Sequence, residues 1–247
     1  MTRRELAQPG ATTEAIIERL TASENVCDNR RGADLQELLT LSRGPWRERF
    51  EILRFASMEE GALAVVCRLS VTGLVCRDGQ PVRHGAFVCA LGIPNSYPLA
   101  PPTVQFLGTI PWCGHVVHKD FLPEVSQLPP FLQEYLRQGH GRCCYVRSSQ
   151  WRADVGTLAI ALWQVSRLVS FDKTRGEVAS LNPMARDYAR RLAEDGGSVP
   201  LGPPLPYPRV DDLEQVGATA VAETPRTVEG DDVEWLPKET EGQPDAS

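Results

Sequence analysis

Three runs of β-forming residues follow one another between residues 50 and 93, and they constrain the fold more than any other feature of the sequence. The runs are FEILRFAS (50–57), LAVVCRLSVTGLV (63–75) and AFVCALGI (86–93), each rich in β-branched or aromatic residues. A fourth run, TVQFLG (103–108), follows a proline cluster, and Asp78-Gly79 is a hairpin signal between the second and third runs. Strands that succeed one another in this way predict a four-stranded antiparallel meander.

Four further segments carry apolar residues at helical spacing, and we expect them to cover the sheet: residues 12–25, 31–43, 154–170 and 181–195. The third is the most apolar and has Asp154 as its expected N-cap, and the fourth has Pro183 in its first turn. This order of helices, strands and helices predicts an α+β fold in which the sheet packs against helices.

The composition of this 247-residue chain predicts one domain with extensions. We expect a helical N-terminal extension over 1–29, a core over 30–195 with an insertion at about 118–139, and a disordered, acidic, proline-rich tail over 196–247. Residues 199–247 have a net charge of −8, so the rest of the chain carries about +2. A body so close to neutral gives no argument for nucleic-acid binding.

No apolar run reaches the roughly 20 residues that span a bilayer, and no export signal is visible, so we expect a cytoplasmic protein without a membrane partner. The seven cysteines are an odd number and widely spread, which fits poorly with a disulfide framework. We expect most of them to be reduced and buried.

Two adjacent cysteines, Cys143 and Cys144, stand in the glycine-flanked segment GHGRCCYVRSSQW (139–151). A thiolate is both a good nucleophile and a good leaving group, so it can accept an acyl group from one thioester and pass it to an amine. Most cysteines in protein cores are inert. A glycine just before this pair, a tryptophan just after it and a proline-rigidified turn upstream, in IPNSYPLAPPTVQFLGTI (93–110), favour a reactive role here.

The turn from Tyr97-Pro98 to Pro101-Pro102 resembles the YPxxPP turn of ubiquitin-conjugating (E2) enzymes, and Gly141-Arg142-Cys143-Cys144 is similar to the Gly-x-x-Cys of their active site. Trp151 and the two helices after it extend the resemblance over residues 30–195. The resemblance implies an E2 (UBC-like) fold and a transferase that carries a ubiquitin-like protein as a cysteine thioester, without a cofactor. It also implies that Tyr97, Pro98, Pro101 and Trp151 contribute to partner binding.

The resemblance leaves two choices of nucleophile. Registration on the glycine selects Cys144, whereas counting back from the tryptophan selects Cys143. We prefer Cys144 because the glycine offset varies less within the family. His115 falls at the place of the asparagine in the family's His-Pro-Asn motif, which implies support for the oxyanion or for the active-site loop. Where some members carry an acidic residue that orients the incoming lysine, this chain has Ala179 or Ser180.

These departures, together with the insertion and the tail, look more like the divergent E2-like proteins of bacteria than the eukaryotic enzymes. The resemblance then implies a bacterial conjugation pathway, and several such pathways serve antiphage (antiviral) defence. Its partners would be an E1-like adenylating enzyme, a ubiquitin-like modifier and often a metal-dependent deconjugating peptidase.

Two other functions stay open. Six Cys and His residues within 32 positions favour a zinc site, but their spacing is not that of a standard finger or ribbon, so we predict no metal: Cys113, His115, His118, His140, Cys143 and Cys144. The other function is that of an E2-variant scaffold, which binds a ubiquitin-like partner without chemistry. Such variants usually lack the active-site cysteine, whereas this chain has one in register.

Overall fold

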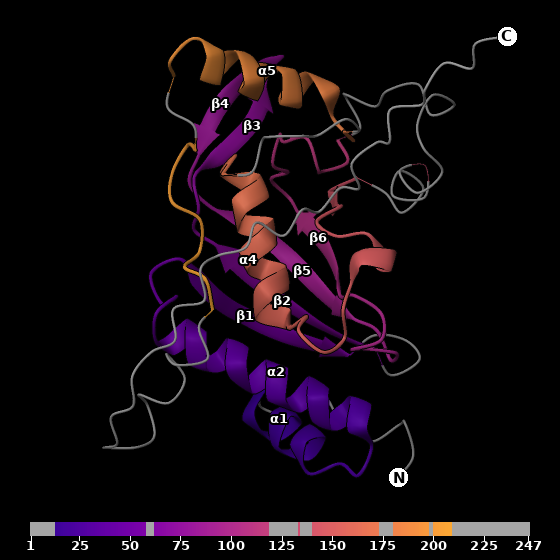
Figure 1. Cartoon of the computed structure of the whole chain (residues 1–247). Helices are drawn as coiled ribbons and strands as arrows, with labels where there is room; N and C mark the ends of the chain where they lie inside the picture. The colour runs from indigo at the N-terminus through magenta and orange to yellow at the C-terminus, as the bar shows by residue number, and fades with distance from the viewer. Residues whose placement is uncertain are drawn as a thin grey trace, which may run out of the picture.

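A five-stranded antiparallel sheet with helices around it forms the body of the protein in a computed structural model (Figure 1). The structure describes residues 13–57, 62–118, 133, 140–172, 180–197 and 200–208. The sheet order is β1-β2-β5-β6-β7, with bounds Phe50–Ser57, Leu63–Leu69, Phe87–Ile93, Thr103–Leu107 and Arg142–Cys143. The first four of these strands neighbour one another in chain order, which confirms the α+β class and the antiparallel meander.

The predicted strand over 63–75 is in fact two strands. β2 ends at Leu69, and β3 (Gly73–Arg77) leaves the sheet to form a separate hairpin with β4 (Gln80–His84). A Cβ on Gly73 would lie 2.7 Å from a side-chain carbon of Val169, so β3 packs closely against a helix. The predicted hairpin at Asp78-Gly79 is confirmed, because both residues adopt positive φ angles of 51° and 75° between β3 and β4.

Four α-helices are found among the described residues: α1 (Thr13–Thr21), α2 (Val26–Arg43), α4 (Leu158–Val169) and α5 (Pro183–Glu194). α4 crosses one face of the sheet, α1 and α2 lie at one end, and α5 lies beside the β3–β4 hairpin at the other end (Figure 1). α2 begins at Val26, so the expected boundary at residue 30 falls inside a helix. The part of the chain that the structure describes contains no helix long and apolar enough to cross a membrane.

α4 starts later than the sequence predicts. Thr157 is its N-cap and accepts a hydrogen bond from the N–H of Ile160 at 3.2 Å, whereas Asp154 forms an exposed ion pair with Arg152 at 2.6 Å. Gly156 lies so close to the Trp151 ring that a Cβ there would meet ring atoms at 2.6 Å. The Trp151 ring thus packs against Gly156, just before the first residue of α4.

Residues 200–208 correct the expected disorder, because Leu201, Leu205 and Pro208 are buried and the segment forms hydrogen bonds with the core. Pro204 and Pro206 accept hydrogen bonds from Arg49 (2.9 Å) and from the Trp46 indole (3.0 Å). The N–H of Leu205 donates to Ser166 Oγ of α4 at 3.0 Å, and the Leu205 side chain is buried. We call residues 200–208 the strap. The predicted tail beyond residue 208, and the predicted insertion apart from His118 and Gln133, lie outside the described residues.

The strap should contribute to global stability. We expect Leu205→Ala to lower the free energy of unfolding by about 2–4 kcal/mol, since it empties a buried site. Leu99→Ala removes the same atoms from a side chain that is 76% exposed and should change stability by less than about 0.5 kcal/mol. Urea unfolding of both variants measures the difference, and equal effects would show that the strap is not part of the fold.

Candidate functional site

Cys143 and Cys144 lie at the outer edge of the sheet, where the short strand β7 pairs with β6. Cys143 is opposite Val104 in the sheet and forms an isolated bridge with Val116 on its other side. Its side chain is 1% exposed. Burial raises the pKa of the Cys143 thiol well above its ordinary value, and the neighbouring thiols of Cys113 and Cys144 raise it further. Cys143 is therefore a core thiol with little tendency to ionise.

Cys144 follows β7 directly and is the more exposed of the two, at 9%. Its backbone is bound twice by His115: the Cys144 N–H donates to the His115 carbonyl at 2.8 Å, and His115 Nδ1 lies 3.1 Å from the Cys144 carbonyl oxygen. Because a carbonyl oxygen can only accept, Nδ1 carries the hydrogen in this contact. In the neutral imidazole, Nε2 is then the nitrogen with the lone pair.

Backbone hydrogen bonds join the 113–117 segment to the 141–144 segment. Val117 donates to the Arg142 carbonyl at 2.9 Å, and Gly141 donates to the Val117 carbonyl at 2.8 Å. Gly141 has φ of 84°, and a Cβ on it would lie 2.6 Å from the carbonyl oxygen of Phe106. Only glycine fits this backbone conformation and this close contact at position 141. The motif glycine from which Cys144 was assigned therefore has a structural reason.

The proline turn flanks the cysteine segment and is held from two directions. The Trp151 indole N–H donates to the Pro98 carbonyl, and the Tyr145 hydroxyl donates to the Pro102 carbonyl, each at 2.6 Å. The Tyr97–Pro98 peptide bond is cis, and Pro101 is half-buried in the same turn. The structure therefore joins the turn to the residue after Cys144 and to Trp151.

Tyr97 does not present its ring to a partner, because its side chain is completely buried. Its hydroxyl donates to Asp34 of α2, and Asp34 also pairs with Arg30 at 2.8 Å. Arg30 donates in turn to the carbonyl of Gly156 at 3.1 Å, beside Trp151. This buried network anchors the turn to α2. The residue that the turn does expose is Leu99, at 76%.

Sequence reasoning missed Arg30, Asp34 and Glu37. Polar residues beside core leucines on one helix, such as Asp34 before Leu35 and Glu37 before Leu38, are the signal that could have indicated a buried network. Burial is the main cause that raises the pKa of Asp34 above its usual range. Burial, and then the negative charge of Asp34, raise the pKa of Glu37 to about 7. The pKa values of these two neighbouring carboxyl groups are thus both raised.

The zinc-site alternative requires several Cys and His side chains to converge on one point. His118 and His140 approach each other with ring centroids 5.0 Å apart. Nevertheless, no group of three or more His, Cys, Asp or Glu side chains is placed to hold a metal ion anywhere in the described ranges.

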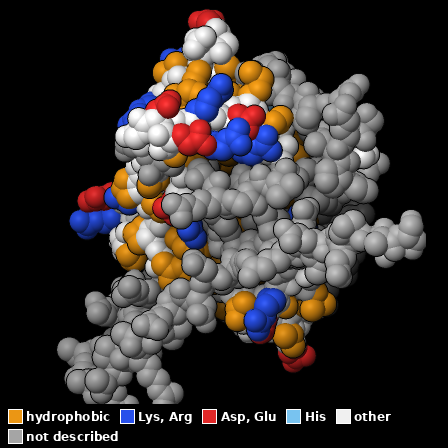
Figure 2. All heavy atoms as spheres, turned by 45° about the horizontal axis from the view of Figure 1, so that its top comes forward, with side chains coloured by type: hydrophobic (Ala, Val, Ile, Leu, Met, Phe, Trp, Pro, Cys, Tyr) orange, Lys and Arg blue, Asp and Glu red, His pale blue; other side chains and the backbone are white. Residues whose placement is uncertain are grey.

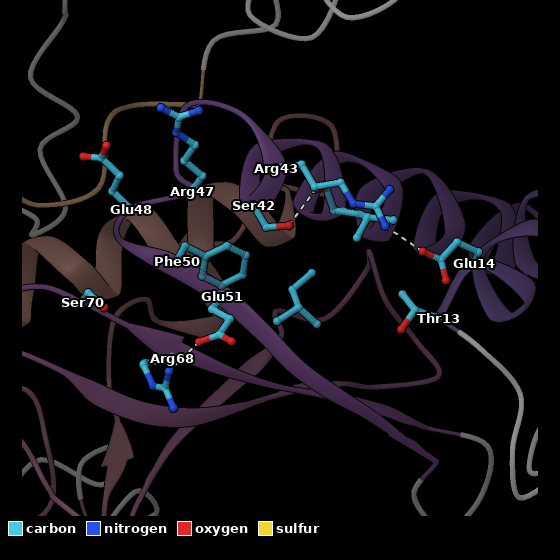
Figure 3. A pocket seen from close by; sticks show the side chains of 12 residues that line it. Thr13, Glu14, Ser42, Arg43, Arg47, Glu48, Phe50, Glu51, Arg68 and Ser70 are labelled. Carbon is cyan, nitrogen blue, oxygen red and sulfur yellow. Dashed lines mark hydrogen bonds and ion pairs between the residues drawn. The ribbon is translucent and has the colours of Figure 1, made fainter.

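A separate groove of about 570 Å³ lies between α1, α2, β1 and β2 (Figure 3). Its rim carries two exposed ion pairs, Arg43–Glu14 at 2.7 Å and Arg68–Glu51 at 2.6 Å. The groove lies at the β1 edge of the sheet, and β7 is the opposite edge. It has no cysteine or histidine in its lining, so it is distinct from the cysteine site.

Comparison with known proteins finds no matching family model and no similar curated protein. The function must therefore be argued from the residues and their geometry.

The two cysteines should react differently with iodoacetamide. We expect Cys144 to be alkylated faster than Cys143, because the Cys143 side chain is 1% exposed and burial raises the pKa of its thiol well above the ordinary value. Both lie in the tryptic peptide 143–147, in which fragmentation mass spectrometry separates them. The half-buried Cys27 and Cys76 serve as internal references, and faster labelling of Cys143 would contradict this assignment.

Glu37 should make stability depend on pH. Between pH 4.5 and about 7 the folded chain keeps a proton on Glu37 that the unfolded chain has lost, so the free energy of unfolding falls as the pH rises. Glu37→Gln removes this cost of ionisation. We expect the variant to gain stability relative to wild type between about pH 5 and about pH 8, as measured by urea unfolding. The exposed Glu48→Gln should show no such trend.

Proposed function

We propose that this protein is an E2-like conjugating enzyme that carries a ubiquitin-like protein as a thioester on Cys144. In the loading step, the Cys144 thiolate attacks the carbonyl carbon of the modifier's C-terminal thioester on an E1-like partner, whose thiolate leaves. In the transfer step, an amine attacks the new thioester, loses a proton and forms an amide, and the Cys144 thiolate leaves. No cofactor is needed for either step.

The order of elements supports an E2 (UBC-like) architecture. A helix, α2, precedes the antiparallel meander; the proline turn joins β5 to β6; the cysteine segment, α4 and α5 follow. The motifs that resemble those of E2 enzymes occur in the same order along the sequence. Two of them are in contact, because the Trp151 indole donates a hydrogen bond to the Pro98 carbonyl of the proline turn.

The observation that carries the proposal is the backbone pairing of Cys144 with His115 at the end of β7. It holds a cysteine at the edge of the sheet on a fixed backbone, while the adjacent Cys143 points into the core. A fixed nucleophile that differs from its neighbour in burial suits selective acyl transfer.

The tautomer of His115 favours support of the active-site loop over direct help to an oxyanion. Its Nδ1–H is committed to the Cys144 carbonyl, so only the imidazolium form has a second N–H to offer to a tetrahedral intermediate. In the neutral form the ring holds the Cys144 backbone, which is one of the two roles that the family position implies.

The partners of this function are an E1-like adenylating enzyme and a ubiquitin-like modifier, with a deconjugating metallopeptidase in the same bacterial, antiviral pathway. The proposal places these proteins in the cytoplasm with the conjugating enzyme. The exposed Leu99, next to Pro98 and Pro101, is the apolar side chain at which a partner would contact the proline turn.

A scaffold without chemistry is the second candidate, and the low exposure of Cys144 favours it. An E2-like carrier needs its sulfur to reach the modifier's C-terminus, whereas a scaffold does not. The two functions differ in whether a covalent adduct forms.

Incubation with ATP, the E1-like protein and the modifier should give an adduct of chain plus modifier on a non-reducing gel. We expect the adduct in wild type and in Cys143→Ser, its loss on reduction, and no thiol-sensitive adduct in Cys144→Ser, because an oxygen there cannot form a thioester. Intact mass verifies each species. An adduct that requires Cys143 would move the nucleophile, and no adduct with a modifier that the E1-like protein activates would favour the scaffold.

A further inference from the structure

The carbonyl of Gly114, the residue just before His115, accepts hydrogen bonds from three consecutive residues. The Ser180 hydroxyl donates at 2.7 Å, and the backbone N–H groups of Leu181 and Asn182 donate at 2.8 Å and 3.3 Å. All three donor residues are buried, with Ser180 5% exposed. We call residues 180–182 the clamp. Hydrogen bonds in a buried site fix geometry strongly, because breaking one leaves a polar group without water.

The clamp is itself fixed by α5. Asn182 is the N-cap of this helix, and its Oδ1 accepts from the N–H of Ala185 at 3.1 Å. The Tyr188 ring of α5 packs edge-on against Trp112, with centroids 5.6 Å apart. α5 therefore holds the segment before His115 at two points, through the Gly114 carbonyl and through the Trp112 ring.

The outer face of α5 carries its charges. Arg186 pairs with Asp187 at 2.9 Å, and Arg190 lies 3.9 Å from Glu194. Figure 2, which brings this end of the molecule forward, shows basic, acidic and hydrophobic side chains interspersed there. The ion pairs of α5 thus lie on its outer face. The clamp residues, in contrast, are buried.

Ser180 also stands near the position at which some E2 enzymes carry an acidic residue that orients the incoming lysine. Here the side chain is buried and donates to a protein carbonyl, and its oxygen accepts the Asn182 N–H at 3.2 Å. The hydroxyl therefore uses both its hydrogen and its oxygen in hydrogen bonds to the protein backbone. The residue is placed to act on the protein's own backbone and not on an acceptor lysine.

We propose that Ser180 is a positioning residue for the cysteine site: through Gly114 it sets the backbone of His115, and through His115 it sets the backbone of Cys144. The effect passes along a continuous chain of hydrogen bonds, from the Ser180 hydroxyl to the Gly114 carbonyl and then across the His115–Cys144 pairing. This inference rests on the proposed function for its catalytic meaning, but the geometric coupling does not.

The test compares Ser180→Ala with Ser166→Ala. Ser166 is a buried serine of α4, and its hydroxyl donates to the Trp163 carbonyl and accepts the Leu205 N–H. Ser166→Ala therefore removes one donor and one acceptor, as Ser180→Ala does, but at the contact with the strap. Unfolding in urea first measures the stability of both variants. Ser180→Thr, which keeps the hydroxyl, is the conservative partner.

We expect the rate of adduct formation to fall about five- to tenfold in Ser180→Ala, which corresponds to the loss of about one buried hydrogen bond. Ser166→Ala should stay within about twofold of wild type at comparable loss of stability. Ser180→Thr, if it folds as wild type does, should recover most of the rate. Equal rates for Ser180→Ala and wild type, or equal losses in both alanine variants, would overturn the proposal.

A second measurement needs no modifier, and it separates this inference from the proposed function. Amide hydrogen exchange of the Cys144 N–H, read residue by residue by NMR, should speed up in Ser180→Ala and not in Ser166→Ala, because this N–H is bonded to the His115 carbonyl. If wild type forms no adduct, the proposed function fails while this exchange still tests the clamp. Unchanged exchange in Ser180→Ala would overturn the coupling by itself.

Discussion

The pairing between the 113–117 and 141–144 segments is the constraint on which the rest of the site depends. It turns two stretches that are separated by the insertion into one edge of the sheet, with Cys143 bridged to Val116 and Cys144 bonded to His115. The alternation of side chains along an extended backbone then sends Cys143 into the core. Backbone hydrogen bonds therefore decide which of the two adjacent thiols is the more deeply buried.

Two independent anchors hold this edge in place. The proline turn is tied to Trp151 and Tyr145 on one side and, through Tyr97 and Asp34, to α2 on the other. The clamp and α5 fix the approach to His115. The strap makes its contacts elsewhere, where it binds α4 to the turn that follows α2. Because the anchors come from distant parts of the chain, the site is assembled only when the whole domain folds.

The sequence predicts the elements with strong local signals and misses those whose cause lies elsewhere in the chain. The runs at 50–57 and 86–93 and the Asp78-Gly79 turn are local, and they appear as predicted. The run at 63–75 is divided between β2 and β3, where Gly73 packs against Val169 of α4. β7 has only two residues and exists because β6 and Val116 pair with it. The strap has the composition of a disordered tail, yet Trp46 and Ser166 supply partners that no local pattern reveals. Thr157 caps α4 in place of Asp154, whose side chain pairs with Arg152.

The site shows the same division. Gly141 registers the cysteines for a reason that the backbone makes plain, a positive φ against Phe106, so a short motif was enough to place Cys144. The Arg30–Asp34–Tyr97 network and the clamp join residues that are tens of positions apart, and no single-sequence pattern reports them. The hydrogen bond of His115 Nδ1 to the Cys144 carbonyl joins residues 29 positions apart, and no local pattern indicates it.

The central claim is that Cys144 carries an acyl group and passes it on, and discharge of a purified adduct tests it most directly. The chain bearing the modifier is separated from the E1-like protein and ATP, mixed with free lysine, and followed by intact mass. Carrier function predicts that the mass returns to that of the free chain while a modifier–lysine amide accumulates. An adduct that stays intact in lysine, although thiol releases it, would contradict the account.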